Sequence, residues 1–454
     1  MGTGVFMLLL DLTVVNVALP DIRRAFGASL SDLQWTIDAY ALTLAAFLLT
    51  AGALADRLGR RRLFASGLAV FTAGSLACGL ATGPLSLIIA RAGQGVGGAI
   101  MFATSLALIA QAFQGRDRAV AFGLLGAITG VAVAVGPVVG GLLTSGISWR
   151  WIFFVNLPIG IAALLVTLRR VDESRNPFAQ RPDIAGFATF STGLAALTFG
   201  LIRSTPDGWG STTVVASLTA AVVLLCAFVV AERLQPHAMF DLALLRKPSF
   251  DGGLIAALGI NGSLFSLLTY LILYFQQSLG LSAAQTGVRF LPLTVAIFVA
   301  SGIAGRLSDR VPIRALIAPG FGLVAAGLVL MRGVDATSAW THFLPGMIVA
   351  GIGAGLVNVP LAATAIGVVE PARAGMASGI NTTFRQVGTA TGVAALGSIF
   401  AGHADLAGGL DEILLVGAGI ACVAGVASLV LIRARDFVEP AEVEAALERE
   451  EALV

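Results

Sequence analysis

The sequence predicts an all-α polytopic membrane protein with about fourteen membrane-spanning helices. Of its 454 residues, 57% are hydrophobic and 12% are charged, which is too little charge to cover the surface of a water-soluble domain of this size. Apolar stretches of about 17 to 25 residues recur along the whole chain, and each can cross a hydrocarbon core of about 30 Å as a helix. We therefore expect two six-helix bundles plus two inserted transmembrane helices.

Each expected span is a continuous apolar run between polar connections. The spans lie near residues 4–20, 33–55, 63–82, 85–113, 119–143, 150–168, 183–202, 213–231, 250–277, 285–305, 314–331, 341–368, 373–401 and 412–432. The seventh and eighth spans take the place of a central loop. The expected units are an N-terminal bundle (1–170), an inserted pair with its linkers (171–245), a C-terminal bundle (246–432) and an acidic tail (433–454).

Basic residues predict the orientation, because short cytoplasmic loops collect Lys and Arg. Most of the 28 basic residues fall in the connections that face the cytoplasm if the N-terminus is inside. We therefore expect a multi-pass protein of the cytoplasmic membrane with both termini in the cytoplasm. The first span is expected to be retained, since no basic residue precedes it and it carries Asp11 and Asn16, unlike a signal peptide.

Two carboxylates lie inside the first two spans. Asp11 stands in LDLTVVNVALP (10–20), and Asp38 stands in QWTIDAYAL (34–42). An acid at mid-membrane costs roughly 2.5 to 3.5 kcal/mol, so such residues are usually kept for proton, ion or substrate handling. A carboxyl group removed from water holds a proton more readily, so either acid could load and release one. The alternative for Asp38 is a satisfied polar contact, and for Asp11 a tie between helices.

Weak internal repeats indicate two related halves. ADRLGRRR (55–62) follows the second span, and SDRVPIR (308–314) follows the tenth. Gly95, Gly97 and Gly98 of the fourth span have counterparts in Gly351, Gly353 and Gly355 of the twelfth. Such self-similarity is typical of transporter halves that pack around a midplane cavity.

Other polar or helix-bending residues are candidates for that cavity or for its movement. Arg91 lies in the fourth span, where snorkelling to the interface is the alternative. Pro137, in the fifth span, removes a backbone donor and bends a helix. The second half has no mid-span carboxylate, so proton handling is assigned to the first half. The candidate cavity residues, for each of which simple packing is the alternative, are Asn16, Tyr40, Gln94, Tyr270, Tyr274, Gln276, Asn358, Asn381, Phe384 and Arg385.

Together these motifs resemble the fourteen-helix drug:proton antiporter family of the major facilitator superfamily, and the resemblance covers nearly the whole chain. LDLTVVNVALP (10–20), GALADRLGRRRL (52–63), LIIARAGQGVGGA (87–99) and GVAVAVGPVVGGLL (130–143) carry it, with WRWIFFVNLPIG (149–160) and RQVG (385–388) in support. Span ten lacks the additional acid that some multidrug relatives carry.

The resemblance implies roles for three groups of residues. Asp38, Asp11 and Arg91 would couple proton movement to transport. An inner gate, with plain topogenic charge as the alternative, would comprise Gly52, Asp56, Arg57, Gly59, Arg60 and Arg61. The antiporter motif would comprise Gly136, Pro137, Gly140 and Gly141.

The expected function is proton-coupled export of hydrophobic or cationic drugs and similar amphipathic compounds, with antibiotic resistance as the result. The alternative is a dedicated exporter of an endogenous metabolite, antibiotic or lipid-like molecule. A membrane receptor or scaffold is disfavoured, because it would have no use for the two intramembrane acids. We expect no enzyme activity, cofactor, metal site or nucleic-acid partner. The expected partners are the substrate, protons and membrane lipid, with the monomer as the working unit.

Overall fold

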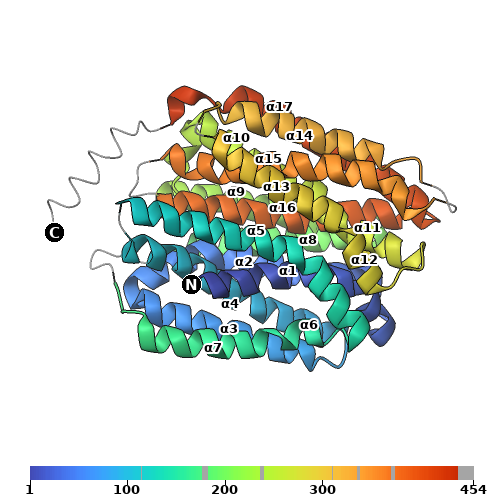
Figure 1. Cartoon of the computed structure of the whole chain (residues 1–454), viewed down its shortest axis with the longest axis horizontal. Coiled ribbons are helices and arrows are strands. Elements are labelled where there is room, and N and C mark those ends of the chain that lie inside the picture. The colour runs from blue at the N-terminus through green and yellow to red at the C-terminus, as the bar shows by residue number, and fades with distance from the viewer. Residues whose placement is uncertain are drawn as a thin grey trace.

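The structure, a computed structural model, is a bundle of helices that run roughly along one direction (Figure 1). It describes residues 1–113, 115–175, 183–235, 240–308, 310–334, 338–369 and 374–437. The α-helices are α1 (Gly2–Phe26), α2 (Leu30–Leu58), α3 (Arg60–Gly79), α4 (Pro84–Ala112), α5 (Gly115–Gly146), α6 (Trp151–Phe154), α7 (Asn156–Arg170), α8 (Ile184–Asp207), α9 (Thr212–Leu234), α10 (Pro248–Ile260), α11 (Ser266–Gln277), α12 (Ala283–Arg289), α13 (Leu291–Leu307), α14 (Arg314–Leu330), α15 (Leu344–Gly367), α16 (Ala374–Ala401) and α17 (Leu406–Leu431). Short helices of other types are η1 (Leu242–Arg246), η3 (Trp340–Phe343) and η5 (Ala434–Asp436), and the π-helix η2 (Asn261–Phe265) joins α10 to α11.

Twelve helical segments among these residues are long and apolar enough to cross a membrane. α14 is apolar but has only 17 residues, and α16 is outside the twelve because Asn381, Arg385 and Gln386 lower its hydropathy. The multi-pass prediction is confirmed, whereas the expected count of fourteen is not. Most of the predicted acidic tail, and Asp309 of the second loop copy, lie outside the described residues.

Local signals set the helix ends near the first connection. Gly27 ends α1 with φ 63°, a left-handed conformation that favours glycine. α2 then begins with a capping box, in which Ser29 Oγ accepts from the Asp32 backbone N–H at 3.2 Å and Asp32 Oδ2 accepts from the Ser29 N–H at 2.8 Å. The chain can therefore reverse direction within three residues.

The two halves repeat one packing scheme that depends on glycine. In the first half, α4 packs on α2 and α3; in the second, α15 packs on α13 and α14. Side chains added at Gly95 or Gly97 would meet the backbones of α2 and α3. Side chains at Gly355 or Gly353 would meet those of α13 and α14 in the same way. The glycines aligned in the sequence thus permit close helix contact, as small residues do in membranes.

The inserted pair lies beside the bundles. α8 packs against α9 and also against α2 and α16. On the α16 side, Ser398 Oγ donates to the Leu201 carbonyl at 2.7 Å and is 2.9 Å from Ser204 Oγ. On the α2 side, α8 offers aromatic contacts, with the Phe47 and Phe187 rings 4.8 Å apart. The pair is therefore hydrogen-bonded to one half and in ring contact with the other.

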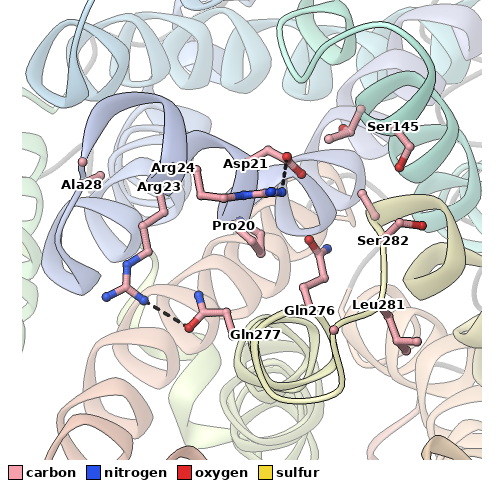
Figure 2. A pocket seen from close by; sticks show the side chains of 14 residues that line it. Pro20, Asp21, Arg23, Arg24, Ala28, Ser145, Gln276, Gln277, Leu281 and Ser282 are labelled. Atoms are coloured by element: carbon pink, nitrogen blue, oxygen red, sulfur yellow. Dashed lines mark hydrogen bonds and ion pairs between the residues drawn. The ribbon is translucent and has the colours of Figure 1, made fainter.

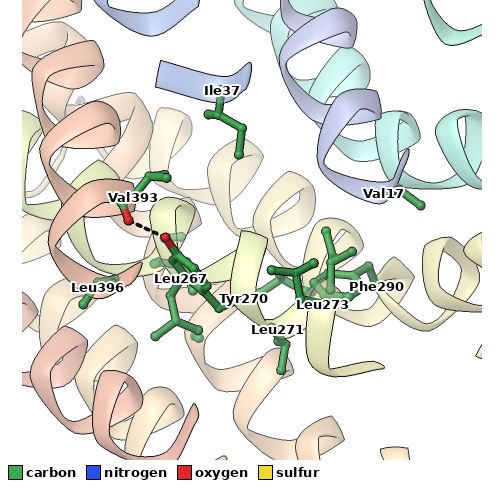
Figure 3. Packing of buried hydrophobic residues seen from close by; sticks show 14 of the residues in the cluster. Val17, Ile37, Leu267, Tyr270, Leu271, Leu273, Phe290, Val393 and Leu396 are labelled. Carbon is green, nitrogen blue, oxygen red and sulfur yellow. Dashed lines mark hydrogen bonds between the residues drawn. The ribbon is translucent and has the colours of Figure 1, made fainter. Parts of the chain in front are cut away.

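The two halves meet most closely at the end that carries the α1–α2, α5–α6 and α11–α12 connections. Described hydrogen bonds between residues 1–170 and 246–432 gather there: Gln276 Nε2 to Val17 O at 2.8 Å, Arg23 Nη1 to Gln277 Oε1 at 3.2 Å, Ala284 N to Ser145 Oγ at 2.9 Å, and Gln34 Nε2 to Tyr270 Oη and Val393 O, each at 3.2 Å. At the opposite end the described contacts are apolar, as between Leu49 and Gly379. Figure 3 shows Tyr270 among the packed side chains of α11, with its hydroxyl on the Val393 carbonyl.

Candidate functional site

Asp11 lies at the centre of a buried polar network in the first half. Its Oδ2 forms an ion pair with Arg91 Nη1 of α4. Its Oδ1 accepts from Gln94 Nε2 at 2.8 Å and from Asn156 Nδ2 of α7 at 3.1 Å. Ser75 of α3 accepts from both amides, at 2.8 and 3.3 Å. The carboxylate therefore connects α1 directly to α4 and α7, and through the two amides to α3.

Arg91 has charged, polar and aromatic partners. Besides Asp11, its Nη1 donates to Gln94 Oε1 at 2.7 Å, and its Nε donates to the Thr36 carbonyl at 3.2 Å. The guanidinium carbon lies 4.2 Å from the centre of the Tyr40 ring, in cation–π distance. The side chain is 1% exposed, so it does not snorkel. Asp11 and Arg91 thus form a neutral, hydrogen-bonded pair, in keeping with the interpretation of Asp11 as a tie between helices.

Asp38 is the opposite case. It is 0% exposed on α2, yet neither of its carboxyl oxygens has a hydrogen-bond partner among the described residues. Buried polar groups are nearly always paired, so an orphan carboxyl needs an explanation of its own. The structure does not bring Asp38 into the Asp11 network, although the sequence groups the two acids together.

The loop after α2 is held by its own half. Asp56 Oδ1 accepts from Arg60 Nε at 2.9 Å, and Arg60 also donates to Gln111 of α4 at 3.0 Å. Gly59 has φ 112°, where glycine is favoured. Gly52 has open space around its Cα, and the Arg57 side chain is exposed.

Glu173, which follows α7, caps the N-terminus of α3. Its Oε1 accepts from the Arg61 backbone N–H at 3.1 Å and its Oε2 from that of Arg62 at 3.3 Å. An acid at this position also suits the helix dipole. Asp56 of the predicted gate thus pairs with a basic residue, while Glu173 caps the helix N-terminus.

The predicted antiporter motif lies between the two halves. Side chains at Gly136 or Gly140 would collide with Thr13 or Val14 of α1, and one at Gly141 with the backbone of Ala283 and Ala284 in α12. A side chain at Gly287 of α12 would collide with the Pro137 carbonyl. The motif therefore provides a smooth surface on α5 for close contact with both neighbours.

In the second half, α15 and α16 bring together three predicted cavity residues. Arg385 Nη1 donates to Asn358 Oδ1 at 2.9 Å, its Nη2 to the Asn358 carbonyl at 3.3 Å, and its Nε to Asn381 Oδ1 at 3.3 Å. The π-helix η2 packs against α16, where Thr389 Oγ1 donates to Asn261 Oδ1 at 3.4 Å. π-helical turns are frequent at functional sites.

The other predicted cavity residues are dispersed. Tyr40 and Gln94 belong to the Asp11 network, Tyr270 and Gln276 join the two halves, and Asn16 is partly buried on α1. Tyr274 packs on Phe343, and Phe384 packs on Phe240 of the segment after the inserted pair. The cavity assignment of these residues stays a prediction.

A cavity of about 980 Å³ lies at the hydrogen-bonded end, between the two halves (Figure 2). Its lining includes Asp21 and Arg24, which pair with each other, and Arg23, which bonds Gln277. Ser145 and Ser282 line the cavity at the right of Figure 2, opposite Arg23. The polar lining indicates a wet vestibule at this end, which the sequence did not predict.

A family model described as Major Facilitator Superfamily matches residues 1–393. The chain belongs to this superfamily. It is 37% identical over 401 residues to multidrug resistance protein Stp of Mycobacterium tuberculosis (strain CDC 1551 / Oshkosh), covering 88% of this chain and 74% of Stp. It is 38% identical over 400 residues to cephamycin export protein CmcT of Amycolatopsis lactamdurans, covering 87% of this chain and 82% of CmcT.

The major facilitator fold is also seen in solved structures. The crystal structure of the human organic anion transporter MFSD10 (TETRAN) superposes with a TM-score of 0.65 at 17% identity, covering 94% of this chain and 98% of that one. The family prediction made from the motifs is confirmed, and with it the assignment to a superfamily of membrane carriers.

Sequence reasoning missed four residues of the described networks: Gln34, Ser75, Asn156 and Glu173. A signal existed for three, since an amide or hydroxyl within an apolar span must find a hydrogen-bond partner. Glu173 lies in the connection after α7, where an isolated acid carries no such signal.

Proposed function

We propose that this chain exports drugs and similar amphipathic compounds across the cytoplasmic membrane in exchange for protons. Membership of the major facilitator superfamily supports transport, and the resistance and export proteins among its relatives support drugs as the cargo. The observation that supports the proton coupling is Asp38, a buried carboxyl group with no hydrogen-bond partner in the described part of the chain.

Asp38 suits a group that is loaded with a proton in one conformation and unloaded in another. An ionised carboxylate without a partner is costly to bury, so the arrangement described here fits the protonated acid. A conformation that lets water reach Asp38 would release the proton. Asp11 is the second acid of the proposal, but a proton on it would remove the counter-charge of Arg91. We therefore assign loading to Asp38 and positioning to the Asp11–Arg91 pair.

The proton gradient is large enough for such work. One proton that moves inward through about 100 mV releases roughly 2.3 kcal/mol, which supports about a fiftyfold gradient of a neutral compound. A monovalent cation exchanged for one proton gains nothing from the voltage. A cationic substrate would draw on the voltage only if a second proton moved inward with each cycle.

We propose fourteen spanning helices, with α14 and α16 added to the twelve apolar ones. Both pack among other helices, α14 against α15 and α17 and α16 against α2, α8 and α10, and a polar helix is tolerated where protein surrounds it. The proposed units keep the boundaries 170, 245 and 432. Because each chain supplies both bundles, we propose a monomer as the working unit.

The proposed orientation places both termini in the cytoplasm, so that the hydrogen-bonded end of the bundle faces outward. The conformation would then be closed outside and inward-facing. Among the described residues Asp56 pairs with Arg60 of its own loop and with none of the other half, as expected of an inner gate that is open.

Accumulation of ethidium, a monocationic dye, tests the proposal in cells that express the wild type, Asp38→Asn or Asp207→Asn at equal membrane levels. Asp207 pairs with Arg203 at the end of α8 and serves as the matched control. The wild type and the control should accumulate less dye than Asp38→Asn, and a protonophore should abolish the difference. Equal accumulation in all strains would exclude ethidium export.

The second candidate is a dedicated exporter of one endogenous compound, which the 38% identity to a protein named for cephamycin export favours. It predicts no efflux of ethidium but protonophore-sensitive release of a metabolite. Comparison of culture media from producing cells with and without the gene would separate the two proposals.

A further inference from the structure

α16 carries a positive charge that no described carboxylate neutralises. The acceptors of Arg385 are two side-chain amides and one backbone carbonyl, all uncharged. The described ion pairs of this half are those of Arg332 with Asp411 and of His403 with Glu412, outside the α15–α16 contact. Asp251, in the first turn of α10, does not neutralise Arg385 either, since the two form no described ion pair. One carboxyl oxygen of Asp251 has no hydrogen-bond partner among the described residues.

The same place has hydrogen-bond donors to spare. A guanidinium has five N–H groups, and the described bonds of Arg385 use three of them. Asn381 is 4% exposed, and its Nδ2 has no partner among the described residues. The Asn381 amide is oriented by Arg385, because Oδ1 must face the Nε donor. Positive charge and unused donors therefore coincide, which is the chemistry of an anion site.

Arg385 is placed where a transported compound could reach it. Asn358 and Arg385 lie near the middle of α15 and α16, well away from the helix ends. The guanidinium is held there by Asn358 and does not extend toward an interface, and the side chain is partly exposed. A lone charge at mid-membrane is costly, so a bound anion would stabilise this region.

We propose that Arg385 and Asn381, with Asn358 as the positioning residue, bind an anionic group of the transported compound, such as a carboxylate. The fork of an arginine matches the two oxygens of a carboxylate and binds it more strongly than a neutral acceptor. This inference rests on the proposed export function and narrows its substrates to amphipathic compounds that carry an acidic group.

The test is a binding measurement without a proton gradient, on purified protein in nanodiscs of phosphatidylcholine. The probes are a diethylaminocoumarin carboxylate and its neutral ethyl ester, followed by fluorescence anisotropy. We expect the wild type to bind the acid at least about tenfold more tightly than the ester, from the usual strength of charged hydrogen bonds. Arg385→Gln should remove this preference, and Arg385→Lys should keep part of it.

Two further variants keep the test independent of misfolding. Asn358→Asp is nearly isosteric and puts a resident carboxylate within 2.9 Å of Nη1, so the preference should vanish although the arginine remains. Arg289→Gln removes an arginine of α12 that bonds its own helix, and the preference should remain.

Several outcomes would overturn the inference. They are equal binding of acid and ester by the wild type, binding of neither, or a preference that survives both Arg385→Gln and Asn358→Asp. Loss of the preference when phosphatidylglycerol is added to the nanodiscs would assign the site to a lipid phosphate, which also overturns it. Because the assay involves no transport, ethidium export without an acid preference refutes only this inference. An acid preference without efflux of either ethidium or the coumarin carboxylate from cells refutes only the proposed export.

Discussion

Arg91 and Arg385 are both arginines inside spanning helices, one in each half, and their surroundings differ. Arg91 has a carboxylate, an amide, a carbonyl and an aromatic ring around it. The acceptors of Arg385 among the described residues are all neutral. The glycine packing of the two halves is alike, whereas their buried charges are not. The two halves thus share one packing scheme but differ in their buried arginines. Arg91 is neutralised by a carboxylate of its own half, whereas no described carboxylate neutralises Arg385.

The largest effect on stability is expected from Arg91→Gln. It leaves Asp11 buried with its remaining amide partners but without its counter-charge, and breaking a buried pair costs about 3 to 5 kcal/mol. The apparent free energy of unfolding in mixed micelles should fall by that amount. Asp11→Asn combined with Arg91→Gln should recover part of the loss. Strictly additive losses in the double variant would show that the pair is not a unit.

Arg385→Gln should destabilise the protein less than Arg91→Gln does. It leaves no charge behind and removes hydrogen bonds to neutral groups, for which about 1 to 2 kcal/mol is the usual scale. The same unfolding measurement applies. A loss as large as that of Arg91→Gln would mean that an undetected acid neutralises Arg385, and the contrast between the halves would disappear.

Glu173→Gln tests the cap on the N-terminus of α3, which faces the cytoplasm in the proposed orientation. Glutamine can keep one bond to the α3 N-terminus but lacks the negative charge, so about 0.3 to 1 kcal/mol should be lost. The loss should shrink when salt is added, since the charge interaction is partly exposed. A salt-independent loss would point to the hydrogen bonds alone. Glu412→Gln, in the second turn of α17, where Glu412 pairs with His403, is the comparison variant.

Asp38→Asn should change stability least, within about 0.5 kcal/mol, because neither carboxyl oxygen has a partner to lose. The amide also occupies almost the same volume as the protonated acid. Unfolding at neutral pH, together with the ethidium assay, checks this expectation. A loss of several kcal/mol would reveal a structural partner of Asp38 and remove the basis for the coupling proposal.

The sequence predicted the membrane class, the family and most helix positions, because apolar runs and motif spacing are local properties. It could not pair Asp11 with Arg91, since that depends on how α1 and α4 rotate about their axes and slide past each other. The tie between α1 and three helices through Ser75, Gln94 and Asn156 is likewise a product of packing. Asp38 stood out in the sequence as an acid, but its lack of partners became visible only in three dimensions.

The α16 segment shows a different limit. Its polar residues remove it from the hydropathy count, although its neighbours enclose it as a core helix. Hydropathy measures compatibility with lipid, and a helix that touches mostly protein need not satisfy it. The helix that hydropathy leaves out is therefore the one that carries Arg385 and Asn381.

The attachment of α8 has a mechanical consequence. Ser204 and Leu201 fasten it to Ser398 of α16, while toward α2 it presents the aromatic rings of Phe187 and Phe199. Hydrogen bonds have a fixed length and direction, whereas ring faces can slide. If the two bundles rotate relative to each other, α8 and α9 would move together with the C-terminal bundle, and α8 would slide along α2. Cross-linking α8 to α2 should then arrest the transport cycle, whereas cross-linking it to α16 should leave the cycle running.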